Sequence, residues 1–378
     1  MADPSTARST ISRGTPAAQY DSSWRNRWIS GTSRCAGSVE IVNPPRPHMR
    51  RSLRSDEAST DSIVLMPTKA TASPVAIWVA LGTVYPIWGS TYLAIAIAVQ
   101  TLPPLFSAGV RFCVAGLVLL GFVAARRGLR LGREQVIGAA IVGLLLVVGG
   151  NGLVVLAERT VPSGLTALII ASVPLWIVIF RRIAGEHIHP STFIGVAVGF
   201  AGVGFLVAPR GSGGADLGGV LLLLVATVSW ALGTFLSPRL ALPRDGLLST
   251  GIQQLAGGVI LVVIGAAAGE LAHLEPERYS TASLLAMAYL VLFGSLVAFT
   301  AYGWLLQHAP VSLVATYAYV NPVVAVLLGA LVLAEPITPA IIIGAAIIIA
   351  AVVFIVTRES ARMRASGVAA IGVGSEAD

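Results

Sequence analysis

From about residue 74 onward, the sequence consists of apolar runs of about 20 residues separated by short polar breaks. A helix needs a run of this length to cross a bilayer. Runs such as "IVGLLLVV" and "IIIGAAIIIAAVVFIV" lack the polar face of a helix on a soluble protein. Charged residues make up 11% of the chain, against about 25% in a soluble domain. The pattern therefore predicts an all-α polytopic membrane protein and argues against an unusually apolar soluble core.

The apolar runs predict ten transmembrane helices. Their expected ranges are 75–97, 103–124, 135–157, 161–181, 191–208, 217–237, 247–268, 282–305, 311–333 and 337–356.

Arginines between the runs predict the orientation of the chain. Eleven lie in alternate loops and the C-terminal segment, whereas the other loops hold three, accompanied by several Asp and Glu. Basic loops stay in the cytoplasm. We therefore expect both termini to be cytoplasmic, in a multi-pass protein of the inner or plasma membrane.

The net charge of +7 has the same origin, because the basic residues cluster in short loops and do not line a groove for phosphates. We expect the lipid bilayer and a small-molecule solute as partners, and no nucleic acid. The two cysteines, Cys35 and Cys113, form neither a disulfide framework nor a metal set. We expect no metal and no cofactor, and the sequence leaves a homo-oligomer open.

The N-terminal segment 1–74 differs from the rest of the chain. Its first 65 residues are rich in Ser, Arg, Pro and Gly, with nine Arg and no Lys, which is typical of a disordered tail. One interpretation is a regulatory or targeting tail. The preferred one is that translation begins at Met66, which makes residues 1–65 a start-site artefact. Residues 358–378 are predicted to form a cytoplasmic C-terminal tail.

Two halves of the membrane part repeat each other. "VPSGLTALIIASVP" at 161–174 matches "APVSLVATYAYVNP" at 309–322, and each holds two prolines twelve residues apart. "YPIWGSTYL" at 85–93 likewise resembles "TVSWALGTFL" at 227–236. Each half has five predicted helices, so the second half enters the membrane from the opposite side. The sequence predicts an inverted repeat, which is common in secondary transporters whose solute site lies between the halves.

Long motifs in both halves carry a family resemblance. "WGSTYLAIAIAVQTLPPLFSAGVRF" and "YLVLFGSLVAFTAYGWLLQHAPVSLVATYAYVNPVVAVLLGALVLAEPITPAIIIGAAII" resemble the EamA family of the drug/metabolite transporter superfamily. The resemblance covers two EamA repeats, 75–208 and 217–357. It implies a transporter, by analogy an exporter, of amino acids, metabolites or amphiphilic compounds.

Aromatic residues inside the first and sixth helices are candidates for a solute pocket. Trp88 and Tyr92 are four residues apart and share a helix face, and Ser90 lies between them. We favour a cavity wall with aromatic and hydroxyl contacts over helix packing with a tyrosine at the interface. Trp230 is the repeat counterpart of Trp88 and has the same two interpretations.

Arg111 is the one basic residue well inside an apolar run, roughly 10 Å from the outer end of the second helix. Snorkelling to that interface or a structural pair with Glu158 is preferred, and an anchor for a substrate carboxylate is the alternative. We include it among the candidate substrate-binding residues.

Further polar residues complete the candidate site. Asn151 follows two glycines, where a hydrogen bond between helices is preferred over pore lining. Tyr302 lies in the eighth helix, and Tyr317 and Asn321 share a face of the ninth. All four are candidate substrate-binding residues.

Repeat-related prolines and glutamates are given structural roles. Pro174 and Pro322 are expected to bend their helices. Glu186 and Glu335 are each expected to cap the helix that follows, where a carboxylate is favourable. Glu158 ends the third helix. No acidic residue lies in the middle of a predicted span, which leaves facilitated diffusion, exchange, or coupling through Glu158 or the substrate's own charge.

The sequence thus favours an alternating-access transporter of a small organic solute that is not an enzyme. A non-transporting receptor or assembly factor would predict a large soluble domain or folded tail. An intramembrane enzyme would need a nucleophile with a base, or a metal cluster, within the spans.

Overall fold

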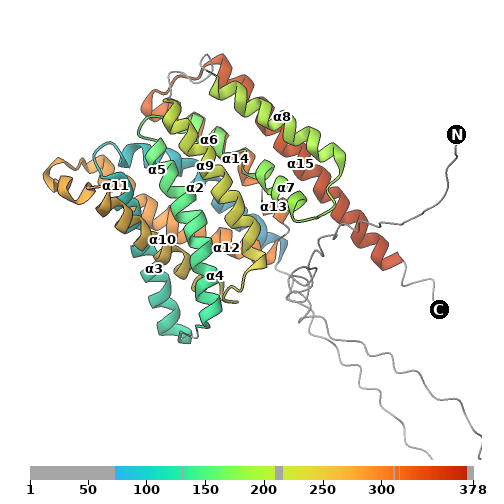
Figure 1. Ribbon diagram of the computed structural model, residues 1–378, viewed down its shortest axis with the longest axis horizontal. Helices are drawn as coiled ribbons and strands as arrows, with labels where there is room; N and C mark the ends of the chain where they lie inside the picture. The colour runs from blue at the N-terminus through green and yellow to red at the C-terminus, as the bar shows by residue number, and fades with distance from the viewer. Residues whose placement is uncertain (1–72, 130, 209–215, 310, 315, 373–378) are drawn as a thin grey trace, which may run out of the picture. The chain divides into compact units, whose positions relative to one another are not determined.

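The computed structural model describes residues 73–129, 131–208, 216–309, 311–314 and 316–372. The predicted tail 1–74, with its possible start at Met66, lies outside the described residues except for its last two positions, as does the end of the predicted tail 358–378. Every regular element of the described part is a helix, and these helices form one bundle (Figure 1). The predicted all-α class is confirmed.

The described residues form ten helical spans. By length and composition, nine of the described helical segments could cross a membrane, and the apolar helix α14 is shorter. The spans are α2 (Pro74–Ala98), α3 (Pro104–Arg127), α4, η2 and α5 (Arg133–Gly143, Leu144–Gly152, Leu153–Ala157), α6 and α7 (Ser163–Ile170, Val173–Ile183), α8 (Pro190–Val207), α9 (Leu217–Leu236) with η3 (Ser237–Arg239), α10 (Gly246–Ala267), α11, η6 and α12 (Thr281–Tyr289, Leu290–Ala298, Phe299–His308), α13 and α14 (Val311–Val314, Tyr317–Leu333), and α15 (Pro339–Gly372). Two 3-10 turns, η4 (Glu270–His273) and η5 (Pro276–Arg278), connect α10 to α11.

Local sequence explains where several spans begin. Asp216 accepts a hydrogen bond from the Gly219 amide at 3.0 Å at the start of α9, and Asp245 accepts one from the Leu247 amide at 2.9 Å at the start of α10. Such caps satisfy amides that the first helical turn leaves unpaired. A proline starts α2, α3, α8 and α15, where its missing N–H costs nothing.

Irregular segments recur at matching places in the two repeats. The third span widens into the π-helix η2 and the eighth into the π-helix η6, each nine residues long. The fourth span breaks between α6 and α7, and the ninth breaks before α14. The predicted continuous helices 161–181 and 311–333 are therefore both interrupted.

The two prolines expected to bend these helices stand at different places after the breaks. Pro174 is the second residue of α7, where no hydrogen bond is lost, whereas Pro322 lies inside α14. The interruption of the fourth span precedes Pro174, and that of the ninth precedes Tyr317.

Helices of the two repeats pair with each other. α2 packs on α14 and α9 on α7, while α3 packs on α10 and α8 on α15 (Figure 1). Exchanging the first with the sixth span, the second with the seventh, the fourth with the ninth and the fifth with the tenth maps these pairs onto themselves. This is the symmetry expected of two inverted five-helix repeats.

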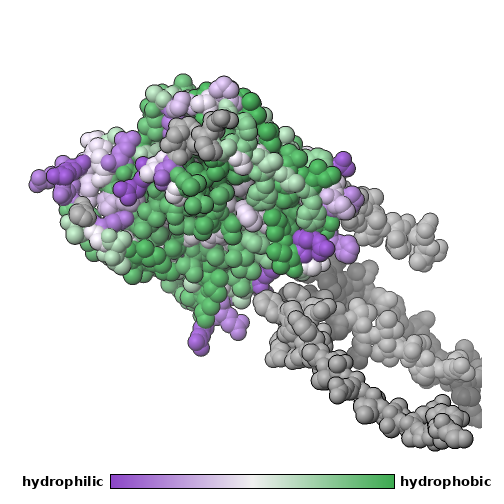
Figure 2. Space-filling model, turned by 45° about the horizontal axis from the view of Figure 1, so that its top comes forward, coloured by the Kyte–Doolittle hydropathy of each residue, from purple (hydrophilic) through white to green (hydrophobic). Residues whose placement is uncertain are grey.

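The outer surface of the bundle is apolar. Large side chains such as Leu331 and Trp78 are exposed, at 80% and 60% of their possible area. Figure 2 shows hydrophobic residues over most of the visible face, with hydrophilic residues gathered towards its ends. A soluble protein rarely exposes such a surface, but a lipid environment requires it.

Candidate solute-binding site

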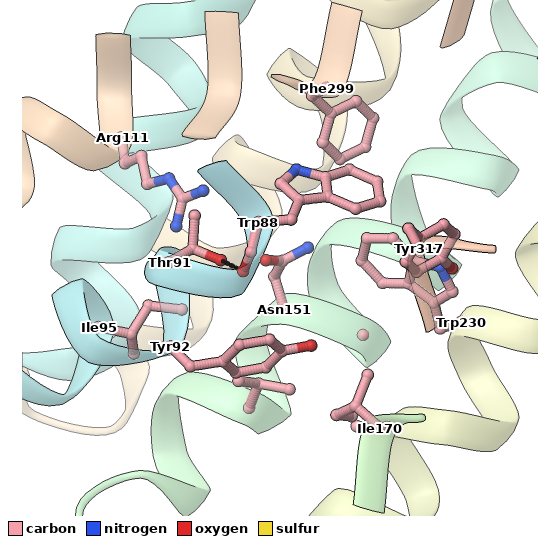
Figure 3. Close-up of a pocket in the computed structure, with 13 residues that line it drawn as sticks. Trp88, Thr91, Tyr92, Ile95, Arg111, Asn151, Ile170, Trp230, Phe299 and Tyr317 are labelled. Atoms are coloured by element: carbon pink, nitrogen blue, oxygen red, sulfur yellow. Dashed lines mark hydrogen bonds between the residues drawn. The ribbon is translucent and has the colours of Figure 1, made fainter. Parts of the chain in front are cut away.

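A pocket of about 600 Å³ lies between the two repeats (Figure 3). Its lining residues come from both repeats and are Trp88, Thr91, Tyr92, Ile95, Arg111, Gly150, Asn151, Val154, Ile170, Ala226, Trp230, Phe299 and Tyr317. Six of the nine predicted substrate-binding residues are among them.

Four aromatic rings surround Trp88 of α2, and together the five residues form an aromatic cluster. The ring centroids of Tyr302 and Tyr317 lie 4.7 and 5.2 Å from that of Trp88. Those of Trp230 and Phe299 lie 5.7 and 6.2 Å away. Most of these contacts are tilted or edge-to-face, the geometry that aromatic pairs prefer. One residue of the first repeat thus contacts three helices of the second.

Gly150 of the π-helix η2 leaves room for the ring of Trp230, which belongs to α9. A Cβ atom on Gly150 would lie 2.6 Å from the Trp230 ring, so only glycine allows this approach. Asn151, the next residue, donates from Nδ2 to the Leu146 carbonyl at 3.2 Å. That carbonyl is five residues back, a consequence of the wide π-helical turn.

Arg111 is buried, with 4% of its surface exposed, so it does not snorkel to the interface. Its Nε donates to Ser295 Oγ at 2.8 Å, and the Ser295 carbonyl accepts from Gln254 Nε2 at 3.1 Å. Figure 3 shows the guanidinium directed towards Trp88 and Thr91. Among the described residues it forms no ion pair, so the predicted pair with Glu158 is absent. Its charge faces the pocket.

The other three predicted residues lie outside this pocket. Tyr302 packs on Trp88 and lines a second cavity. Ser90 shares a 2.6 Å hydrogen bond with the Tyr289 hydroxyl. With its amide oriented to donate, Asn321 reaches the carbonyls of Tyr317 and Tyr85 at 3.2 Å each, which joins α14 to α2.

The second cavity, of about 750 Å³, lies towards the end of the bundle where α9 ends and α10 begins. Phe299 lines both cavities, and Tyr302 lines the second. The aromatic cluster therefore stands between them. The arginine pattern predicts that this end faces the cytoplasm.

Glu335 caps a helix, but not the one that follows it. Its two carboxylate oxygens accept from the backbone amides of Ser163 at 2.8 Å and Gly164 at 3.0 Å, at the start of α6 in the other repeat. The start of α15 is instead capped by Thr338, whose Oγ1 accepts from the Ile341 amide at 3.2 Å. The expected local cap is thus replaced by a contact that joins the two repeats.

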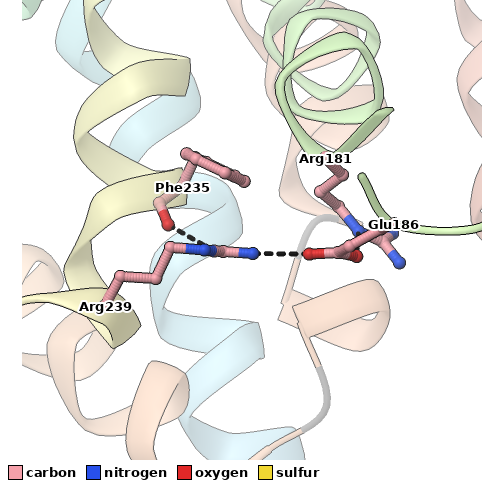
Figure 4. A network of polar contacts seen from close by, with 4 residues as sticks. All are labelled: Arg181, Glu186, Phe235 and Arg239. Carbon is pink, nitrogen blue, oxygen red and sulfur yellow. Dashed lines mark hydrogen bonds and ion pairs between the residues drawn. The ribbon is translucent and has the colours of Figure 1, made fainter. Parts of the chain in front are cut away.

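Glu186 also joins the repeats, through its ion pair with Arg239 (Figure 4). Its carboxylate binds Arg181 of α7 at 2.7 Å and Arg239 of η3. The expected cap of α8 is provided by His189, whose Nδ1 accepts from the Ser191 amide at 3.2 Å. The prediction that Glu186 caps α8 is therefore wrong.

Several residues of this region were not identified from the sequence. Ser295 accepts a hydrogen bond from Arg111, Gln254 donates to the Ser295 carbonyl, and Phe299 and Thr91 line the pocket. The adjacent amides Gln253–Gln254 in the middle of an apolar span were a visible signal. Among the described residues, no group of three or more His, Cys, Asp or Glu could hold a metal ion.

Comparison with known proteins places these features in a family. The model of the EamA-like transporter family matches residues 74–208 and 217–357. The uncharacterized inner membrane transporter YedA of Escherichia coli (strain K12) is 41% identical over 251 residues, which covers 66% of this chain and 80% of YedA. A probable amino-acid metabolite efflux pump of the same strain is 26% identical over 274 residues, covering 69% of this chain and 88% of the pump.

A solved crystal structure of a protein shares the fold. Its TM-score is 0.53 with 22% sequence identity, and the match covers 77% of this chain and 99% of that chain.

Proposed function

The chain belongs to the EamA-like transporter family and is a membrane transporter, and we propose that it exports a small organic solute that carries an anionic group. The solute binds in the pocket between the repeats, with its anionic group at Arg111 and its body against the aromatic cluster. The two halves expose this pocket to either side in turn, as in other inverted-repeat transporters. Amino acids and related carboxylates fit this description.

The buried guanidinium of Arg111 is the observation that carries the proposal. A charged group inside a membrane protein is costly and usually faces a cavity or a partner. The Nε–H of Arg111 donates to Ser295 Oγ. Among the described residues, no acidic side chain forms an ion pair with the guanidinium. A carboxylate in the pocket would meet the remaining N–H groups and form charge-assisted hydrogen bonds.

The two cavities support a route for export. The second cavity lies at the end that the arginine pattern places in the cytoplasm. Phe299 lines both cavities, so a solute would pass the aromatic cluster to reach Arg111. The relative named as a probable amino-acid metabolite efflux pump agrees with this direction.

The test is solute flux in proteoliposomes that contain the full chain. A panel of radiolabelled L-amino acids and other small carboxylates is compared with their neutral carboxamides. Arg111→Gln should lower the flux of a transported carboxylate about 10- to 100-fold, since a hydrogen bond to a charged group contributes about 1.5–3 kcal/mol. The flux of a transported carboxamide should change little.

Arg278→Gln is the matched control, because Arg278 is exposed in the loop before α11. It should transport like the wild type. Equal loss of carboxylate and carboxamide flux in Arg111→Gln would contradict the anion-binding role, and no flux of any carboxylate would contradict the proposed substrate class.

A further inference from the structure

Glu158 is a buried acid that the proposed transport pathway does not use. It directly follows the third span, which ends at Ala157, and only 6% of its surface is exposed. Neither carboxylate oxygen has a hydrogen-bond partner among the described residues. Its predicted partner Arg111 is bound to Ser295 instead.

The groups around Glu158 disfavour its charged form. Among the described residues, the titratable groups that interact with its charge are the Glu335 carboxylate at the end of α14 and the Tyr92 phenol of α2. The adjacent Arg159 is exposed. A buried carboxylate without a donor or a cation is costly, whereas the neutral acid avoids that cost. Burial raises the pKa of the Glu158 carboxyl well above its usual range, and the charge of Glu335 adds to the effect.

Glu335 sits at the contact that closes this end of the bundle. Its carboxylate holds the start of α6 through two backbone amides, an arrangement that favours a negative charge. A second negative charge on Glu158 would repel Glu335 within the same buried region. The contact between α14 and α6 is therefore favoured when Glu158 carries a proton.

Glu158 does not line the solute pocket but lies close to residues that do. Asn151 and Val154 line the pocket, and Glu158 lies four residues after Val154 on the same helix face. Tyr92 is a pocket residue that interacts with it. Glu158 therefore lies between the solute pocket and the Glu335 contact, so its protonation can affect both.

We propose that Glu158 is a proton-binding site whose occupancy holds the α14–α6 end of the transporter closed. The inference rests on the proposed function, since it requires two halves that move. When the end opens, Glu158 meets water and releases its proton. The contact between the Glu335 carboxylate and the start of α6 is broken in this open state.

The direction of the pH effect follows from the two states. In the open state the Glu158 carboxyl meets water and its pKa falls back towards that of a solvated Glu, whereas burial keeps its pKa higher in the closed state. The proton therefore stabilises the closed state fully at a pH below the pKa of the open state. This stabilisation is lost as the pH rises through the pKa of the closed state, with a change of up to about tenfold per pH unit in the ratio of closed to open.

The experiment measures this ratio without a solute. Spin labels are placed at Gln100→Cys and Ile337→Cys, which are exposed positions at this end, one in each repeat. Cys35→Ser and Cys113→Ala remove the native thiols. The reconstituted full chain is examined by pulsed electron resonance from about pH 5 to about pH 9, the range in which buried acids titrate. Infrared difference spectra over the same range record the C=O band of a protonated carboxyl.

In the wild type, a longer distance between the two spin labels should appear as the pH rises, and the C=O band of the protonated carboxyl should disappear. Glu158→Gln, which is neutral and similar in shape, should keep the short distance at every pH and lack the titrating band. Glu335→Gln should show the longer distance already at low pH. The exposed Glu277→Gln is the control and should match the wild type.

A pH-independent wild-type distance, or the same pH response in Glu158→Gln, would overturn the proton site. If Glu335→Gln still opens in that case, the moving halves of the proposed function stand. If no variant and no pH lengthens the distance, both the proton site and the alternating halves are contradicted.

Discussion

Trp88 links the two repeats at the level of a single residue. Its ring contacts four other rings, and all four belong to the second repeat. It also lines the solute pocket, and its neighbour Tyr302 lines the second cavity. Trp88 therefore serves both packing and the separation of the two cavities.

Trp88→Ala tests this double role. Removing a buried aromatic side chain should lower the free energy of unfolding by about 3–5 kcal/mol and should lower solute flux at least tenfold, because the cavities would merge. Trp88→Phe keeps an aromatic ring and should retain most of the stability. Thermal unfolding in detergent and flux in proteoliposomes measure the two effects. Unchanged flux in Trp88→Ala would remove the cluster from the transport pathway.

The sequence identified the candidate residues better than their partners. Trp88 and Trp230 stood out because the repeat aligns them, and Arg111 because it is basic within an apolar run. Asn321 stood out equally, yet it bonds to backbone carbonyls of α14 and α2. Which polar side chain reaches the pocket depends on how each helix is rotated about its axis. That rotation is set by packing against the other helices and cannot be read from the residues of one helix. The roles of these residues in binding remain predictions.

At the scale of elements, α3 and α10 form a close pair between the repeats. A Cβ atom on Gly258 of α10 would lie 2.6 Å from the Cys113 amide nitrogen and 2.9 Å from the Gly109 carbonyl of α3. Both neighbours are backbone atoms, which cannot rotate away. Small residues of this kind allow helices to pack in a membrane, where the hydrophobic effect does not drive their association.

Gly258→Ala should force the two helices apart. Overpacking of this kind costs about 1–3 kcal/mol, which should appear as a lower midpoint of thermal unfolding in detergent. Gly121→Ala is the matched control. Gly121 lies on α3, the partner helix of α10, and a Cβ atom there meets nothing within 4 Å. Equal midpoints for the two variants would show that α3 and α10 do not depend on this close approach.

Element boundaries were largely predictable, and interruptions were not. Apolar runs and starting prolines placed the spans to within a few residues, except that α15 continues to Gly372, well beyond the predicted end at 356. The π-helices η2 and η6 and the break before Tyr317 leave no comparable signal. Within η2, Gly150 lies against the Trp230 ring of another helix, a contact that the apolar character of the run does not reveal.

At the scale of the whole molecule, the two ends of the bundle are held by different chemistry. Glu335 closes one end through two backbone amides of the other repeat. Glu186 connects the repeats at the other end through an ion pair with Arg239, and both side chains are about one third exposed. Exposed ion pairs contribute only about 0–1 kcal/mol, so the Glu186 end is the weaker contact and the easier one to open.

The arginine pattern predicts which of these two ends faces the cytoplasm. Ala241 lies in the arginine-bearing loop between η3 and α10, and Gln100 lies between α2 and α3 at the opposite end, and both are exposed. In a chain with Cys35→Ser and Cys113→Ala, a membrane-impermeant maleimide should label Ala241→Cys in inside-out vesicles and Gln100→Cys in spheroplasts. The reverse pattern would place Glu335 on the cytoplasmic side and would make the proposed export route an import route. Labelling of both positions from one side would contradict an odd number of spans between them, and with it the inverted relation of the two repeats.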